Sequence, residues 1–192
     1  MNDESSDDII EKFGRFKLVA RMQKDLARGV LWRDGKKLIE VSAANDSAAY
    51  KKLHSDFYQL LIDKAKIQGD RVPEDADVVR ALSAIWAQMT DGQVAMLRAH
   101  YHAPLHQMTA TQLAQAAGYK GYSAANLWYG RAGWLLFGEL PRTLPLHTKE
   151  GEPVFTSAIA VQAPQRASPD GEWIWEMRPE VARALKLAGL ER

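Results

Sequence analysis

The chain has 192 residues, of which 46% are apolar and 26% charged, a composition typical of a globular protein rather than a disordered one. It contains no cysteine, which excludes disulfide bonds and thiolate zinc sites, and it has no run of about 20 apolar residues that could cross a membrane. The net charge of +1 does not by itself indicate a nucleic-acid-binding protein. The acidic first eight residues are unlike a secretory signal peptide, so we expect a cytoplasmic protein.

The basic residues are concentrated near the N-terminus. Residues 9–40 carry nine Lys and Arg against four Asp and Glu, a local charge of +5. Such a stretch is either an ordinary solvated surface or a surface that contacts phosphates, and the sequence favours neither interpretation over the other.

The first expected element is an amphipathic helix from Asp8 to Ala27. Its apolar residues recur at steps of three and four, and Gly29 follows as a left-handed helix cap. The opposite face of this helix carries Arg15, Lys17, Arg21, Lys24 and Arg28. Two β-prone runs around Asp34-Gly35 then predict a short hairpin over residues 30–41.

Two further helices are expected over about 46–66 and 76–89, because apolar residues recur there at helical spacing. Pro73 and the acids after it suit the first turn of a helix, so a boundary falls near this residue. We therefore expect a helical N-terminal region over 1–72, with its hairpin, and a second domain over 73–192.

A helix-turn-helix is predicted between Thr109 and Leu140. The sequence contains two capping boxes, Thr90-x-x-Gln93 and Thr109-x-x-Gln112, and the second opens a short helix that ends at Gly118. Ala114 is small enough for two helices to approach closely, and Gly118 can adopt the positive φ of a sharp turn. An ordinary helical hairpin is the alternative.

Two strands are expected behind this motif, over residues 154–161 and 172–177, followed by a helix from Pro179 to Leu190. Helices followed by two strands and a loop describe a wing. The expected fold class is therefore mostly α (α+β): a helical N-terminal portion with a short β-hairpin, followed by a winged helix-turn-helix. Trp173 and Trp175 alternate onto one strand face, where we expect them to be buried.

The second helix of a helix-turn-helix enters the major groove of DNA with its early residues. The buried sides of the two helices of this motif are expected to carry Leu113, Ala117, Ala124 and Leu127. The candidate DNA-contacting residues are Lys120, Tyr122, Ser123, Asn126, Tyr129, Arg131 and, in the wing, Arg166. Asn126 can pair bidentately with adenine, whereas Tyr122 and Tyr129 have packing roles as the alternative.

Neither a metal site nor a catalytic site is expected. His100 and His102 are two residues apart on a helix and diverge, so they and His106 do not form a zinc site. The sequence has no Gly-rich phosphate loop and no Gly-x-Ser-x-Gly elbow. Asp34 and Glu40 lack the following lysine of a metal-dependent nuclease core, so we expect no enzyme and no cofactor.

Three blocks resemble a poorly characterised bacterial module found in or beside HNH and methylcytosine-type restriction endonucleases. They are Met96 to Pro104, Thr109 to Leu127 and Trp173 to Val181, and together the resemblance covers about residues 90–190. It implies a DNA-associated module in bacterial or phage defence. It carries over no nuclease activity, because the HNH metal-and-histidine set is missing, and Trp128 and Trp134 depart from the polar residues expected there.

The sequence thus predicts a non-catalytic protein that binds double-stranded DNA, as a transcriptional regulator or as the recognition component of a restriction or defence system. Proteins of this kind commonly bind as dimers, so a homodimer is included among the expected partners. The alternative function is a protein-interaction adaptor or a phage-encoded inhibitor, whose winged helix docks on a protein partner.

Overall fold

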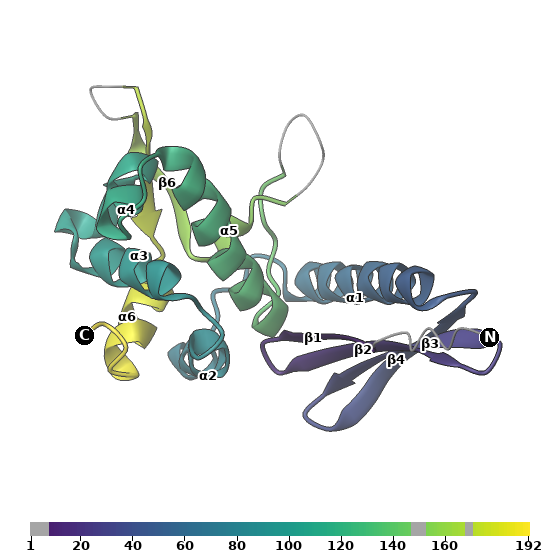
Figure 1. The fold of residues 1–192 in the computed structure, drawn as a ribbon. Coiled ribbons are helices and arrows are strands. Elements are labelled where there is room, and N and C mark those ends of the chain that lie inside the picture. The colour runs from purple at the N-terminus through teal and green to yellow at the C-terminus, as the bar shows by residue number, and fades with distance from the viewer. Residues whose placement is uncertain (1–7, 147–152, 168–170) are drawn as a thin grey trace. The chain divides into compact units, whose positions relative to one another are not determined.

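The computed structural model describes residues 8–146, 153–167 and 171–192, without the side chains of residues 165–167 (Figure 1). The chain divides into two compact units, residues 1–67 and 68–192, which are described here one at a time. None of the described helices is long and apolar enough to cross a membrane.

Unit 1 is a four-stranded antiparallel sheet followed by a helix. The strands are β1 (Ile9–Phe13), β2 (Phe16–Gln23), β3 (Leu26–Arg33) and β4 (Lys36–Ala43), and they lie side by side in chain order. Helix α1 (Asp46–Gln68) runs along one face of this sheet (Figure 1). Its buried residues recur at four-residue steps and are Ala49, Leu53, Phe57, Leu61 and Ala65.

The core of unit 1 lies between α1 and this face of the sheet. Phe16, Leu18 and Ala20 are buried alternately along β2, as a half-buried strand requires. The ring of Phe57 packs against those of Phe16 and Phe13, with centroid separations of 4.8 Å and 5.6 Å. The aromatic cluster therefore holds the helix against the first two strands.

The predicted N-terminal helix is wrong. Residues 9–23 form β1, a turn at Gly14 and Arg15, and β2. The apolar residues fit helical spacing, but Phe16, Leu18 and Ala20 are also spaced at a period of two. The pairing of strands decides between the two patterns. The predicted fold class is corrected accordingly: the chain is α+β, with a four-stranded sheet where the helical N-terminal portion was expected.

Gly29 does not cap a helix but lies buried within β3. A Cβ atom there would lie 2.8 Å from Cγ2 of Val41 and 3.0 Å from the carbonyl oxygen of Ala49. Glycine is required because the backbone of α1 passes close to the sheet at this residue. The hairpin predicted around Asp34-Gly35 is observed as β3 and β4, which are longer than the predicted 30–41.

Unit 2 contains most of the helices and a second sheet. Its elements are α2 (Asp75–Trp86), α3 (Asp91–His102), the 3₁₀ turn η1 (Pro104–His106), β5 (Gln107–Thr109), α4 (Ala110–Ala116), α5 (Tyr122–Glu139), the 3₁₀ turn η2 (Phe155–Ala158), β6 (Ala160–Ala167), β7 (Trp173–Met177) and α6 (Pro179–Leu187). The sheet is antiparallel, in the order β5-β7-β6.

Both capping boxes are confirmed. The side-chain oxygens of Thr90 and Thr109 accept hydrogen bonds from the backbone N–H groups of Gln93 and Gln112, whose side chains accept in return. Gly118 has a φ of 75° and lies between α4 and α5. The helix pair expected after Thr109 is therefore present.

The strands of unit 2 differ from the prediction. Strand β5 was not expected, and it pairs with residues 174–176 of β7. The first predicted strand, over 154–161, begins instead as η2, and β6 follows from Ala160. Residues 168–170, at the tip of the predicted wing, lie outside the described residues.

Candidate nucleic-acid interface

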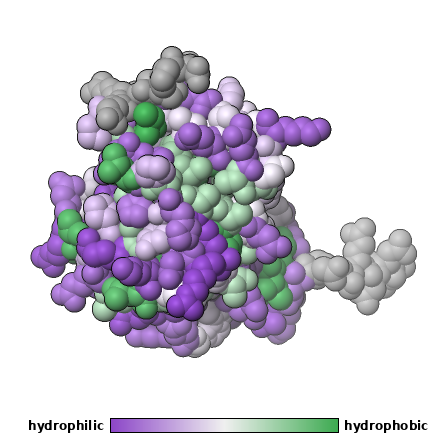
Figure 2. All heavy atoms as spheres, turned by 90° about the vertical axis from the view of Figure 1, so that its left-hand side faces the viewer, coloured by the Kyte–Doolittle hydropathy of each residue, from purple (hydrophilic) through white to green (hydrophobic). Residues whose placement is uncertain are grey.

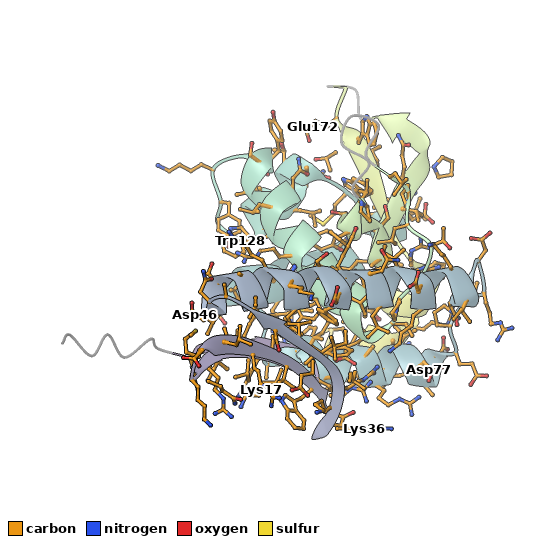
Figure 3. The ribbon with its side chains drawn as sticks, turned by 90° about the vertical axis from the view of Figure 1, so that its right-hand side faces the viewer. Lys17, Lys36, Asp46, Asp77, Trp128 and Glu172 are labelled. Atoms are coloured by element: carbon orange, nitrogen blue, oxygen red, sulfur yellow. The ribbon has the colours of Figure 1, made fainter. Side chains whose placement is uncertain are left out.

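The face of the unit 1 sheet opposite α1 carries three rows of side chains that cross the strands, and we call it the open face. The first row is Lys12, Lys17, Trp32 and Lys37; the second is Ile10, Val19, Val30 and Glu40; the third is Arg21, Arg28 and Ser42. Each row follows from the strand register, because residues paired across an antiparallel sheet point to the same side. Figure 3 shows Lys17 on the side of the sheet away from α1.

The open face is basic. Among its described side chains, five cations, Lys12, Lys17, Arg21, Arg28 and Lys37, stand against the single carboxylate of Glu40. A hydrogen bond from Lys37, together with the charges of Lys37 and Arg28, lowers the pKa of Glu40. Glu40 is therefore ionised at neutral pH and balances only part of the positive charge.

Three of these cations are available to a partner. Lys12, Lys17 and Arg21 form no ion pair with any residue in the part of the chain that the structure describes. Lys12, Lys17 and Arg21 are all exposed, and Trp32, which lies between Lys17 and Lys37 in the first row, is 37% exposed. The face thus combines unpaired charge with an accessible aromatic ring in its first row.

The sequence interpretation placed three of the open-face cations, Lys17, Arg21 and Arg28, on one face of a helix. Lys17 and Arg21 share the open face because they are four residues apart on a strand, and Arg28 joins them because it pairs with Arg21. Arg15 and Lys24, assigned to the same helical face, lie in turns instead, and Arg15 is 3.6 Å from Asp34.

The residues predicted to contact DNA in unit 2 are only partly brought together. Lys120, Tyr122, Ser123, Asn126 and Arg131 are exposed, the last with its guanidinium 5.4 Å from the ring of Trp128. The backbone of Arg166 belongs to β6, but its side chain lies outside the described residues.

The prediction that Tyr129 contacts DNA is wrong, because this side chain is 1% exposed and belongs to the core. The helical phase assumed for α5 was at fault: Ala125, Tyr129, Ala132 and Leu136 are buried, whereas Leu127, expected inside, is 56% exposed. The aromatic side chain of Tyr129 is accommodated inside because its hydroxyl group has a partner in His100.

Part of the exposed side of α5 borders a hollow of about 830 Å³ in unit 2. Its walls are Tyr122, Asn126 and Gly130 of α5, residues 153–157 with Pro145 and Leu146, and residues of β6 and β7 including Gln162, Glu172, Trp173 and Trp175. The expectation that Trp173 is buried is wrong, since it is 59% exposed at this hollow. The alternation of Trp173 and Trp175 was interpreted as a buried strand face, but one side of β7 faces the hollow rather than the core.

Two amide side chains and one carboxylate are among the polar groups that line the hollow. The amide groups of Asn126 and Gln162 have no hydrogen-bond partner among the described residues. The carboxylate of Glu172 accepts hydrogen bonds from the hydroxyl and backbone N–H groups of Thr111, and the hydroxyl bond above all lowers the pKa of Glu172. An acceptor and two amides therefore line the hollow beside its apolar and aromatic residues.

The three neighbouring histidines, His100, His102 and His106, form hydrogen bonds within the protein. His100 is fully buried, while Nε2 of His102 lies 2.9 Å from the carbonyl oxygen of Glu191 and Nδ1 of His106 contacts that of Tyr101. In the described part of the chain, no group of three or more His, Asp or Glu residues is placed to hold a metal ion.

The face viewed in Figure 2 shows mostly hydrophilic residues, with hydrophobic ones in small patches between them. Such scattered apolar residues are ordinary on a protein surface. The open face and the hollow are the two features of the described chain that stand out chemically.

Comparisons with known proteins do not add to this description. No protein-family model matches the chain, and no curated protein or solved structure is significantly similar to it. The resemblance to restriction-associated modules therefore stays a prediction, and the functional argument depends on the chemistry of the open face and the hollow.

Proposed function

We propose that this protein binds double-stranded DNA without catalysing a reaction on it, and that the open face is its main DNA-binding surface. The observation that carries the proposal is the placement of five cations in two rows of one exposed sheet face. Lys and Arg that neutralise phosphates release condensed counterions, which supplies most of the affinity for nucleic acid irrespective of sequence.

The dimensions of the sheet suit a duplex. Neighbouring strands lie about 4.8 Å apart, so the central pair, β2 and β3, fits the major groove, which is about 12 Å wide and admits a two-stranded ribbon. In this arrangement β2 and β3 carry Arg21 and Arg28 to the groove, and Lys12 of β1 and Lys37 of β4 contact the phosphates on its two sides. Sheets are known to enter DNA grooves in this way.

The exposed residues of α5 and the turn before it provide a second contact. Lys120 and Arg131 supply charge, and Tyr122 and Ser123 supply hydroxyl groups that can bind phosphate oxygens. A protein with these two surfaces suits the role of a cytoplasmic transcriptional regulator or of the recognition component of a restriction or defence system.

The test is the binding of the full chain to fluorescent 30-base-pair duplexes and to single strands of the same sequence, measured by anisotropy at about 50 mM and 200 mM salt. The proposal predicts binding that favours the duplex and weakens steeply as salt is raised. Preference for the single strand would assign the open face to stacking on unpaired bases instead. Absence of binding at the lower salt concentration contradicts the proposal and favours the adaptor function.

A further inference from the structure

We propose that the hollow of unit 2 receives one nucleobase that is turned out of the DNA stack. The inference rests on the proposed function, because the base comes from bound DNA. It assigns to the walls of the hollow a role that is separate from the phosphate contacts of the open face. Its support is the combination of ring faces, hydrogen-bonding groups and a preformed wall.

The ring faces come from two elements. Tyr122 of α5 is 57% exposed, and Trp173 and Trp175 of β7 lie with ring centroids 6.3 Å apart. Stacking of a base on an aromatic side chain contributes about 1–3 kcal/mol and is available to every base. A base that leaves the duplex loses stacking with its neighbours, and these rings can replace it.

The polar groups of the hollow match the edge of a base better than an aliphatic group. An amide offers both donors and an acceptor, so Asn126 and Gln162 can each pair with a base edge. The ionised carboxylate of Glu172 can accept a hydrogen bond from an exocyclic amino group. An apolar occupant would displace water from the amides of Asn126 and Gln162 without replacing its hydrogen bonds, which costs free energy.

The wall that η2 forms beside α5 is held in place by contacts within the fold. A Cβ atom on Gly133 would lie 2.1 Å from the carbonyl oxygen of Phe155, so η2 packs directly against the helix backbone. The Arg178 Nε atom donates to the carbonyl oxygen of Ser157 at 2.7 Å. The hollow therefore exists before a ligand enters, as is usual for sites of a few hundred Å³.

The experiment compares the affinity of the full chain for a perfect duplex with its affinity for the same duplex carrying one unpaired base. An unpaired base costs less free energy to extrude, so the chain should bind the duplex that carries it about tenfold more tightly than the perfect duplex. The variants Trp173→Ala and Gln162→Ala should remove this preference while keeping the affinity for the perfect duplex within about threefold. Leu127→Ala, an exposed apolar change on α5 outside the hollow, is the matched control and should keep the preference.

The outcomes separate the inference from the proposed function. If duplexes bind but the unpaired base brings no preference, or if the preference survives in both variants, the inference is wrong and the proposed function stands. If the chain binds free nucleosides through Trp173 but shows no preference between duplexes, the hollow takes a free nucleoside and the inference is overturned. If no duplex binds, both fail. Far-UV circular dichroism checks that each variant is folded.

Discussion

His100 and Tyr129 are hydrogen-bonded to each other in the interior of unit 2, with His100 Nδ1 2.6 Å from the Tyr129 hydroxyl oxygen. The second ring nitrogen, Nε2, lies 3.0 Å from the carbonyl oxygen of Trp175. Since a carbonyl group can only accept, Nε2 carries the proton and Nδ1 accepts from the tyrosine hydroxyl. The neutral imidazole thereby connects α3 to α5 and β7, two elements that line the hollow.

Unit 2 should lose stability in mild acid. Burial lowers the pKa of His100 to about 4, whereas the unfolded chain has the ordinary value of about 6.5. The unfolded state therefore binds the proton first, and stability is complete above pH 6.5 and is lost as pH falls from 6.5 to 4, by about 3 kcal/mol. Urea unfolding followed by tryptophan fluorescence at pH 7.0, 5.5 and 4.5 checks this. A midpoint that stays constant between pH 7.0 and 4.5 would show that His100 is not buried as neutral imidazole.

Tyr129→Phe removes the donor to His100 Nδ1 and leaves that buried nitrogen unpaired. The free energy of unfolding at pH 7 should fall by about 1–3 kcal/mol, the usual cost of an unsatisfied buried polar atom. Tyr122→Phe, which removes an exposed hydroxyl group on the same helix, is the control and should change stability little. Equal stabilities of both variants and the parent chain would argue against the hydrogen bond.

A buried charge network links Arg142, which follows α5, to Arg178 and Glu180 at the start of α6. Arg142 Nη1 lies 2.7 Å and Arg178 Nη1 3.9 Å from Glu180 Oε1, and the Glu180 side chain is only 6% exposed. Burial alone would raise the pKa of Glu180, but the hydrogen bond and charge of Arg142, with the charge of Arg178, lower it overall. Glu180→Gln leaves two guanidinium groups without a counter-charge.

We expect Glu180→Gln to destabilise unit 2 by about 3 kcal/mol, as is usual when one partner of a buried ion pair is removed. Asp77→Asn breaks only the exposed pair with Arg80 and should cost less than about 1 kcal/mol. Thermal or urea unfolding of the two variants side by side measures the difference. Similar small losses in both would mean that Glu180 is not charged in the folded state.

Gly29→Ala should destabilise unit 1, because the added methyl group would press against Val41 and the backbone of Ala49. Overpacking of this kind typically costs about 1–3 kcal/mol. Gly121→Ala, at a position with open space around it, is the matched change and should be nearly neutral. Hydrogen exchange of the α1 amides reports on unit 1 directly, and unaltered protection in Gly29→Ala would contradict the close approach of α1 to the sheet.

What could be predicted from the sequence was local. The capping boxes at Thr90 and Thr109 were recognisable because each depends on residues three apart. Residues 9–23 were misread because apolar spacing alone does not separate a helix from two short strands. One of the two strands that pair with β2, β3, also lies beyond these residues. Strand β5 is three residues long and exists only because β7 pairs with it.

The site was harder to predict because it depends on tertiary contacts. The sequence predicted that Trp173 is buried and that Tyr129 is exposed, whereas the structure has Trp173 exposed and Tyr129 buried. The burial of Tyr129 is explained by His100, which is 29 residues away in sequence, and the exposure of Trp173 by a hollow built from several segments. The basic residues of the open face were visible in the composition, but only the strand register shows that they share a face.

The most direct test of DNA binding by the open face is the salt dependence of duplex affinity in a charge-neutralised variant. Lys12→Gln, Lys17→Gln and Arg21→Gln together remove three cations that form no ion pair with the described residues. The control removes the same charge from exposed positions of α1, with Lys51→Gln, Lys52→Gln and Lys66→Gln. The account predicts that the open-face variant binds at least about tenfold more weakly at low salt, with a double-logarithmic salt slope reduced by about 2–3, while the α1 variant binds as the parent chain does. Equal affinities and slopes for all three proteins would contradict it.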